Sequence, residues 1–178
     1  MNFLNLSKKR QSCRKYSDAP VPKEVLERCV EAARLAPSAC NSQPWRFIVV
    51  AETELKNKLA DAAFSGVHTM NSFAKNAPVL VAVVTERSKY AAQLAGHFRG
   101  TQYSLIDLGI AGEHFCLQAA EEGLGTCWLG WFNQRGVKKV LGLSRKDQID
   151  IMFSVGYPQG DGLREKIRKD VVEISEFR

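Results

Sequence analysis

The 178-residue sequence lacks several patterns that mark common classes of protein. It contains no run of about 18 apolar residues, so no membrane-spanning helix is expected. The segment from Met1 to Arg14 is too polar to hold the apolar core of a signal peptide. We therefore expect a cytoplasmic protein with no membrane partner.

The cysteines and histidines form no recognisable ligand pattern. Five cysteines are present, but no C-x-x-C pair, which argues against a zinc ribbon and a thioredoxin-like redox site. His68, His97 and His114 are far apart in the sequence, so no metal site is expected. Serine–histidine–aspartate, H-E-x-x-H and paired-carboxylate signatures are missing too, so no side-chain nucleophile or catalytic acid–base pair is indicated.

The positive charge is concentrated near the two ends of the chain. The net charge is +6, and lysines and arginines gather in Lys8–Lys15 and Arg164–Lys169. Two remote basic segments can converge on one anion. A nucleic-acid binder would show a basic stripe interleaved with exposed aromatic residues, whereas Trp45, Trp128 and Trp131 lie in apolar contexts. That alternative is the weakest, and we expect no nucleic-acid partner.

The periodicity of apolar residues predicts one domain, residues 1–178, that mixes helices and strands. A short polar helix or turn is expected over 7–20. The 78–85 strand should be buried on both faces, because it is apolar at nearly every position. The 103–122 helix is apolar around much of its circumference, and part of its cover could be another subunit. Helices are expected over 22–35, 54–64 (with Thr53 as N-cap) and 103–122, and strands over 46–51, 78–85, 125–131 and 149–157.

Three segments carry candidate chemistry. Arg10 and Arg14 are four residues apart, so on a helix they would share a face and could address one phosphate or carboxylate; the alternative is a solvated basic face. The loop at 36–45 has prolines near both ends, and its amides and hydroxyls suit the edge of a heteroaromatic ring.

The glycine-rich stretch at 123–131 is not a dinucleotide-binding loop. Such a loop follows a strand and opens a helix, whereas this one follows a helix and leads into a strand. Trp128 also occupies the position of the third glycine. What remains is a backbone that could pass close to a flat ligand.

Four segments of the sequence carry a resemblance to a known family. In chain order they are RQSCRKY, APSACNSQPWRFIVV, EEGLGTCWLGWF, and VGYPQG followed by KIRKDVVEI. Together they resemble the FMN-dependent nitroreductase family. The resemblance runs from about residue 8 to residue 175. It implies a three-layer α+β fold, with a central mixed or antiparallel sheet wrapped by helices, in an intertwined homodimer with FMN at the interface. It also implies ping-pong electron transfer from NAD(P)H to nitroaromatic, quinone or related small acceptors.

The resemblance also implies a set of flavin-binding residues. Arg10 would face the phosphate and Arg14 the N1/C2 edge of the ring. The residues implied are Arg10, Gln11, Ser12, Arg14, Lys166 and Arg168 from one subunit; Pro37, Ser38, Ala39, Asn41 and Gln43 from the other; and Asn71, Trp128, Leu129 and Gly130 near the ring. Tyr90, Phe98 and Tyr103 could line the acceptor pocket or belong to the core.

Two other functions stay open beside this one. The first keeps the fold and the flavin but changes the chemistry, for example to reductive dehalogenation or flavin destruction. Relatives of that kind usually carry a longer lid with polar groups, and no such segment is visible. The second is a non-catalytic module that stores or senses FMN.

Overall fold

The computed structural model describes residues 2–86, 100–160 and 162–178. Both 3-10 helices, η1 and η2, lie in the first half of the chain. The elements are α1 (Phe3–Lys9), α2 (Lys23–Arg34), η1 (Ala39–Asn41), β1 (Trp45–Val50), α3 (Thr53–Ala63), η2 (Gly66–Asn76), β2 (Val79–Thr85), α5 (Tyr103–Glu121), β3 (Gly125–Leu129), α6 (Gln134–Val140), β4 (Gln148–Gly156) and α7 (Val171–Ile174).

An antiparallel sheet forms the centre of the fold, with its strands in the order β1-β2-β4-β3. Side chains alternate between the two faces of a strand. In β2, accordingly, Val79, Val81 and Val83 belong to one apolar cluster, and Leu80, Ala82 and Val84 belong to another. All but the last residue of β2 are buried, as expected for a central strand that is covered on both faces.

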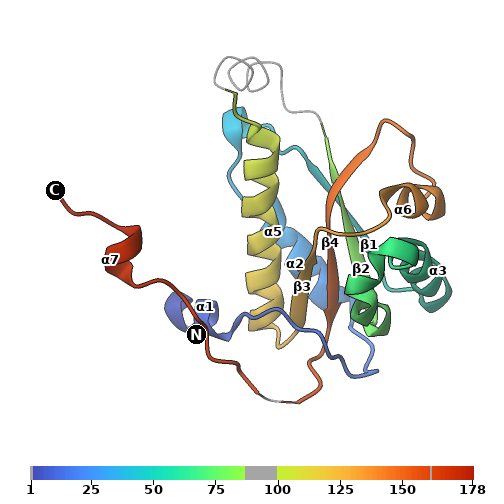
Figure 1. Cartoon of the computed structure of the whole chain (residues 1–178), viewed down its shortest axis with the longest axis horizontal. Helices are drawn as coiled ribbons and strands as arrows, with labels where there is room; N and C mark the ends of the chain where they lie inside the picture. Colours follow the sequence, from blue (N-terminus) through green and yellow to red (C-terminus); the bar gives the residue numbers. More distant parts are fainter. Residues whose placement is uncertain (1, 87–99, 161) are drawn as a thin grey trace.

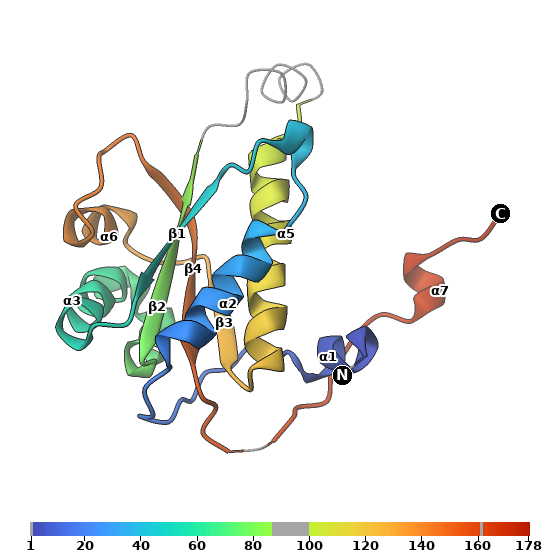
Figure 2. The ribbon, with the colours of Figure 1, turned by 180° about the vertical axis from the view of Figure 1, so that it is seen from behind.

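Helices cover both faces of the sheet and give three layers (Figures 1 and 2). One face carries α2 and α5, and the opposite face carries α3 and α6. Cys29 of α2 and Phe115 of α5 belong to the first apolar cluster, and Leu59 of α3 and Val137 of α6 to the second. The expected α+β fold is confirmed, with the sheet antiparallel.

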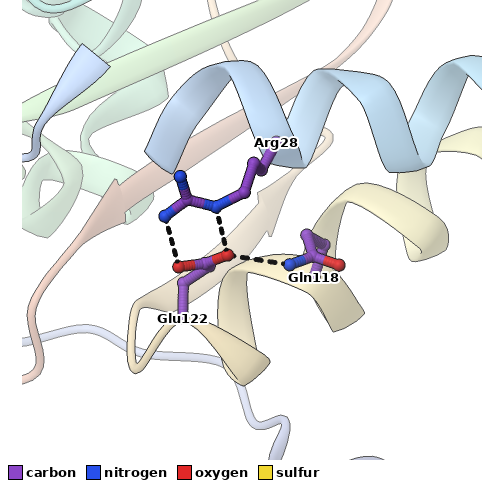
Figure 3. A network of polar contacts seen from close by, with 3 residues as sticks. All are labelled: Arg28, Gln118 and Glu122. Atoms are coloured by element: carbon purple, nitrogen blue, oxygen red, sulfur yellow. Dashed lines mark hydrogen bonds and ion pairs between the residues drawn. The ribbon is translucent and has the colours of Figure 1, made fainter. Parts of the chain in front are cut away.

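A polar clamp joins the two helices of the first layer (Figure 3). Arg28 of α2 donates from Nε and Nη2 to the two oxygens of Glu122, at 2.7 and 2.8 Å. Gln118 adds a third hydrogen bond to Glu122 at 2.9 Å. The bidentate contact with Arg28 lowers the pKa of Glu122. The clamp fixes α2 against the C-terminal end of α5.

Two local expectations were wrong. The N-cap of α3 is Glu52, whose carboxylate accepts hydrogen bonds from Glu54 N and Leu55 N at 2.8 and 2.7 Å; Thr53 lies inside the helix. The 7–20 segment is helical only as far as Lys9, where α1 ends. Its remainder is extended, because it pairs with other segments rather than with itself.

The two ends of the chain project together from one side of the molecule. Figure 1 shows α1 beside the C-terminal segment, with α7 extending beyond it. Many apolar side chains there are exposed, among them Phe3, Ile167, Val171, Val172, Ile174 and Phe177. In the described ranges, no helix has the length and apolar character that crossing a membrane requires.

Candidate functional site

The segment after α1 lies against the edge of the sheet in an extended conformation. Ser12 forms a parallel bridge with Thr126 of β3, and Cys13 N donates to Thr126 O at 2.8 Å. Gly125 permits this approach, since a Cβ there would lie 2.6 Å from Cys13 Cβ. Arg10 and Arg14 therefore do not share a helical face. That premise was wrong, because pairing with a strand edge overrides the local helical spacing.

The buried Tyr16 anchors the end of this segment. Its hydroxyl lies 2.8 Å from Ser154 Oγ in β4 and donates to Cys13 O at 2.8 Å. Burial raises the pKa of Tyr16, so the phenol stays protonated and able to donate. The extended segment is thus held at Ser12 and at Tyr16, with Arg14 exposed between them.

The C-terminal segment pairs with the N-terminal one through side chains. The Gln11 amide donates to Gly162 O at 3.0 Å and accepts from Arg164 N at 3.1 Å. Arg164 also donates to Ser12 O, and Lys166 Nζ donates to Ser7 O and Arg10 O. These contacts bring the two basic ends of the sequence together.

A cavity of about 290 Å³ opens where the two segments meet. Five cationic side chains and one carboxylate line it, so its charge is strongly positive. Burial, together with the positive charges of Arg10 and Arg168, lowers the pKa of Lys166. The lining residues are Arg10, Gln11, Ser12, Arg14, Arg164, Glu165, Lys166, Ile167 and Arg168.

This donor set suits a phosphate-bearing ligand. Guanidinium groups bind phosphate oxygens in charge-assisted, bidentate contacts, and a serine hydroxyl adds a further donor. The six predicted residues from the two chain ends all line the cavity. Arg164 was not predicted, although it belongs to the same basic run as Lys166 and Arg168.

A second group of predicted residues adjoins Arg14. The Arg14 guanidinium lies over the ring of Phe73, with Arg14 Cζ 5.8 Å from the ring centroid. In the same η2 segment, Asn71 Nδ2 donates to Trp131 O at 3.0 Å, which ties η2 to the chain just beyond β3. Gly130 is exposed, so its backbone is accessible beside these groups.

The Trp128 and Leu129 side chains point into the core rather than into a cleft. Trp128 packs edge-to-face on Phe153, with 4.7 Å between the ring centroids, and touches the backbone of α5 at Gly112. Leu129 is buried in the opposite cluster. A ligand lying along this stretch would meet backbone groups. Trp131, expected in an apolar context, is instead 52% exposed.

The two other glycines of the stretch at 123–131 serve the fold. Gly123 has φ +80° and follows the C-cap of α5, with Leu124 N bonded to Ala119 O at 2.8 Å and Gly123 N to Ala120 O at 3.2 Å. This pattern is a Schellman motif, which favours glycine at the left-handed position. Gly125 makes room for Cys13, so Gly130 is the glycine left to approach a ligand.

The loop that carries Pro37, Ser38, Ala39, Asn41 and Gln43 lies at the other end of α5. Figure 1 places it at the upper, N-terminal end of the helix, whereas the Arg10 segment crosses near the lower end. Ala39 N donates to Asp107 Oδ1 of α5 at 3.0 Å. Cys40, Asn41 and Gln43 are exposed. Within one chain, therefore, the structure does not bring this group of predicted residues to the cavity.

The expected pocket aromatics fall in two places. Tyr90 and Phe98 lie outside the described residues. Tyr103 is half-buried at the first position of α5.

Comparisons with known proteins match nearly the whole chain. Residues 7–69 and 67–157 match the model of the Nitroreductase family. An NADH dehydrogenase of Thermus thermophilus is 30% identical, over 86% of this chain and 85% of that protein. An iodotyrosine deiodinase of Thermotoga neapolitana is 26% identical, over 88% of each.

A solved structure shares both the fold and the sequence similarity. The FMN-dependent nitroreductase from Clostridium difficile R20291 superposes with a TM-score of 0.77 and 27% identity, over 98% of each chain. This chain belongs to the nitroreductase family.

Proposed function

We propose that the protein is an FMN-dependent oxidoreductase that passes electrons from NAD(P)H to nitroaromatic, quinone or related small electrophiles. The observation that carries the proposal is the cationic cavity built from both ends of the chain. FMN carries close to two negative charges on its phosphate, which the arginines would neutralise. An FMN-dependent relative and one named NADH dehydrogenase support the cofactor and the electron donor.

The side chains would bind and orient rather than react. Arg10 and Arg168 would hold the phosphate, and Arg14, the exposed cation beside η2, would favour negative charge on the ring. Bound FMN supplies the hydride-transfer chemistry, so no side-chain nucleophile is needed. The nicotinamide and the acceptor would then use the same exposed face in turn, which is a ping-pong scheme.

We also propose that the active form is a homodimer. The loop of Ser38, Asn41 and Gln43 lies far from the cavity in its own chain (Figure 1), so it would serve the cavity of a second copy. The apolar side chains of Leu105 and Ile106 on α5 are 41% and 51% exposed. Exposed apolar side chains also occur in the C-terminal segment, among them Val171, Val172 and Phe177, and obligate dimers bury side chains of this kind.

A spectrum and a steady-state assay test the proposal. Protein purified with excess FMN and then desalted should retain the visible absorbance of flavin. It should also oxidise NADH or NADPH when menadione or a nitrofuran is supplied. Flavin retention without NAD(P)H oxidation would indicate the storage module instead, and no retention would refute the proposal.

Reductive dehalogenation is the second candidate, because the chain resembles an iodotyrosine deiodinase along most of its length. Iodide release from iodotyrosine, with the flavin reduced by dithionite, tests it directly. Iodide release together with slow nitrofuran reduction would favour this alternative.

A further inference from the structure

The loop that follows α2 is held in an unfavourable backbone conformation. Cys40, Asn41 and Gln43 have φ of 53°, 49° and 48°, in the left-handed region that L-residues rarely adopt. Such conformations persist only where the surroundings hold them, and they gather at functional sites. Something must therefore fix this loop.

Hydrogen bonds inside the loop provide part of the restraint. Ser38 Oγ accepts from Gln43 N at 2.9 Å, and Gln43 Nε2 donates to Asn41 Oδ1 at 2.8 Å. Ser38 occupies the N-cap position of η1, yet its side chain does not cap the helix. Its hydroxyl is used to close the loop, so the first N–H of η1 needs another acceptor.

Asp107 provides that acceptor from outside the loop. It is 3% exposed, and its Oδ1 accepts from Ala39 N at 3.0 Å. Ala39 is the first residue of η1, so the carboxylate satisfies one of the backbone N–H groups that a helix leaves free at its start. It joins the strained loop to α5, which also carries Glu113, the partner of Arg10.

The other oxygen of Asp107, Oδ2, is buried and has no hydrogen-bond partner among the described residues. Leaving a carboxylate oxygen buried and unsatisfied is costly. The contact that this cost maintains is the hydrogen bond from Ala39 N to Oδ1, which holds the loop against α5.

We propose that Asp107 is a positioning residue for the cofactor: it fixes the loop at Ala39 so that Ser38, Asn41 and Gln43 are presented to FMN in one arrangement. The inference rests on the proposed function, since it requires the loop to contact flavin. Asp107 acts through the loop and does not itself touch the cofactor.

The first test uses flavin-free protein. Asp107→Leu keeps nearly the same side-chain shape but cannot accept a hydrogen bond, whereas Asp107→Asn keeps an oxygen for Ala39 N. Amide hydrogen exchange over residues 38–43 should be about tenfold faster or more in Asp107→Leu and close to wild type in Asp107→Asn. Asp61→Asn, on α3 and paired with Lys75, is the matched control. Unchanged exchange in Asp107→Leu would overturn the inference.

The second test measures FMN affinity by quenching of flavin fluorescence. Asp107→Leu should raise the Kd by about tenfold or more, and Asp107→Asn should restore it to within about threefold of wild type. Circular dichroism checks that the variants fold, and Asp107→Ala replaces Asp107→Leu if the latter does not.

The outcomes separate the inference from the proposed function. If Asp107→Leu loosened the loop but still bound FMN with wild-type affinity, the inference would be refuted and the proposed function would stand. An Asp107→Asn variant as impaired as Asp107→Leu would refute it as well, because rescue through Ala39 would have failed. Absence of FMN binding by the wild-type protein would refute the proposed function, and the inference with it.

Discussion

The guanidinium of Arg10 is held by the carboxylate of Glu113, with Arg10 Nε 3.1 Å from Glu113 Oε1. The contact uses Nε, while a bidentate contact to phosphate can use the two terminal nitrogens. Glu113 lies on α5, so the central helix orients a side chain from the segment that follows α1. Arg10 is thereby pre-organised to bind an anion in the cavity, although the Glu113 carboxylate lies beside it.

Arg10→Ala should weaken FMN binding by about 1.5–3 kcal/mol, through loss of a charged phosphate contact. Equilibrium titration of flavin fluorescence measures the change. Riboflavin, which lacks the phosphate, is the control and should bind both proteins equally. Full retention of FMN by the variant, or an equal loss for both ligands, would contradict the phosphate assignment.

Diluting the holoprotein should release flavin as the dimer dissociates, because each site draws on both chains. Sedimentation velocity and flavin fluorescence, recorded over the same concentration series, should show parallel transitions. A monomer that remains saturated with flavin would contradict the shared site.

Gly112→Ala should destabilise the fold by about 1–3 kcal/mol, as overpacked core substitutions do. A Cβ at this position would lie 2.5 Å from Trp128 Cη2 and 3.1 Å from Phe153 Cζ. Urea unfolding measures the effect. Adding Trp128→Phe removes the crowded ring edge and should recover part of the loss, whereas strictly additive effects would show that the two residues do not interact.

Glu122→Gln should lower the urea midpoint at neutral pH, because it removes the negative charge and one of the two acceptor oxygens of the clamp between α2 and α5 (Figure 3). The folded-state pKa of Glu122 is lowered, so its contribution is present above the unfolded pKa of about 4.3 and is lost as pH falls through the folded value. The difference from wild type should therefore shrink in acid.

Glu31→Gln is the matched control for that experiment. The Glu31 carboxylate pairs with Arg34 within α2 at 2.7 Å, and this contact also lowers its pKa, but it joins no second element. Its removal should change the midpoint less. Equal effects of the two substitutions would mean that the clamp adds nothing to tertiary stability.

The helices and strands with a regular apolar pattern were predictable, because apolar residues recur along them at the positions that become buried. The 22–35 and 103–122 patterns correspond to α2 and α5, and the 78–85 run to β2. The α6 and η2 segments were not predicted. The α6 helix spans only seven residues, and η2 is a 3-10 segment with a kink at Asn71. The N-terminal segment was interpreted as a short helix or turn, because its partner, the edge of β3, lies more than a hundred residues away in sequence.

The site was predictable in composition but not in geometry. Arg10, Arg14 and Arg168 were recognised as anion ligands, yet their convergence depends on contacts such as those of Lys166 with Ser7 and Arg10. Asp107 could not be recognised from the sequence, because a single acidic residue in an apolar helix looks like a residue that faces solvent. Only its hydrogen bond with Ala39 reveals its place.

The cavity that joins residues 10–14 to residues 164–168 has a consequence for biosynthesis. Its walls cannot all be present until the chain has been synthesised as far as Arg168. A phosphate-bearing ligand could then meet the complete lining only after that point, and products terminated before residue 164 would lack half of it.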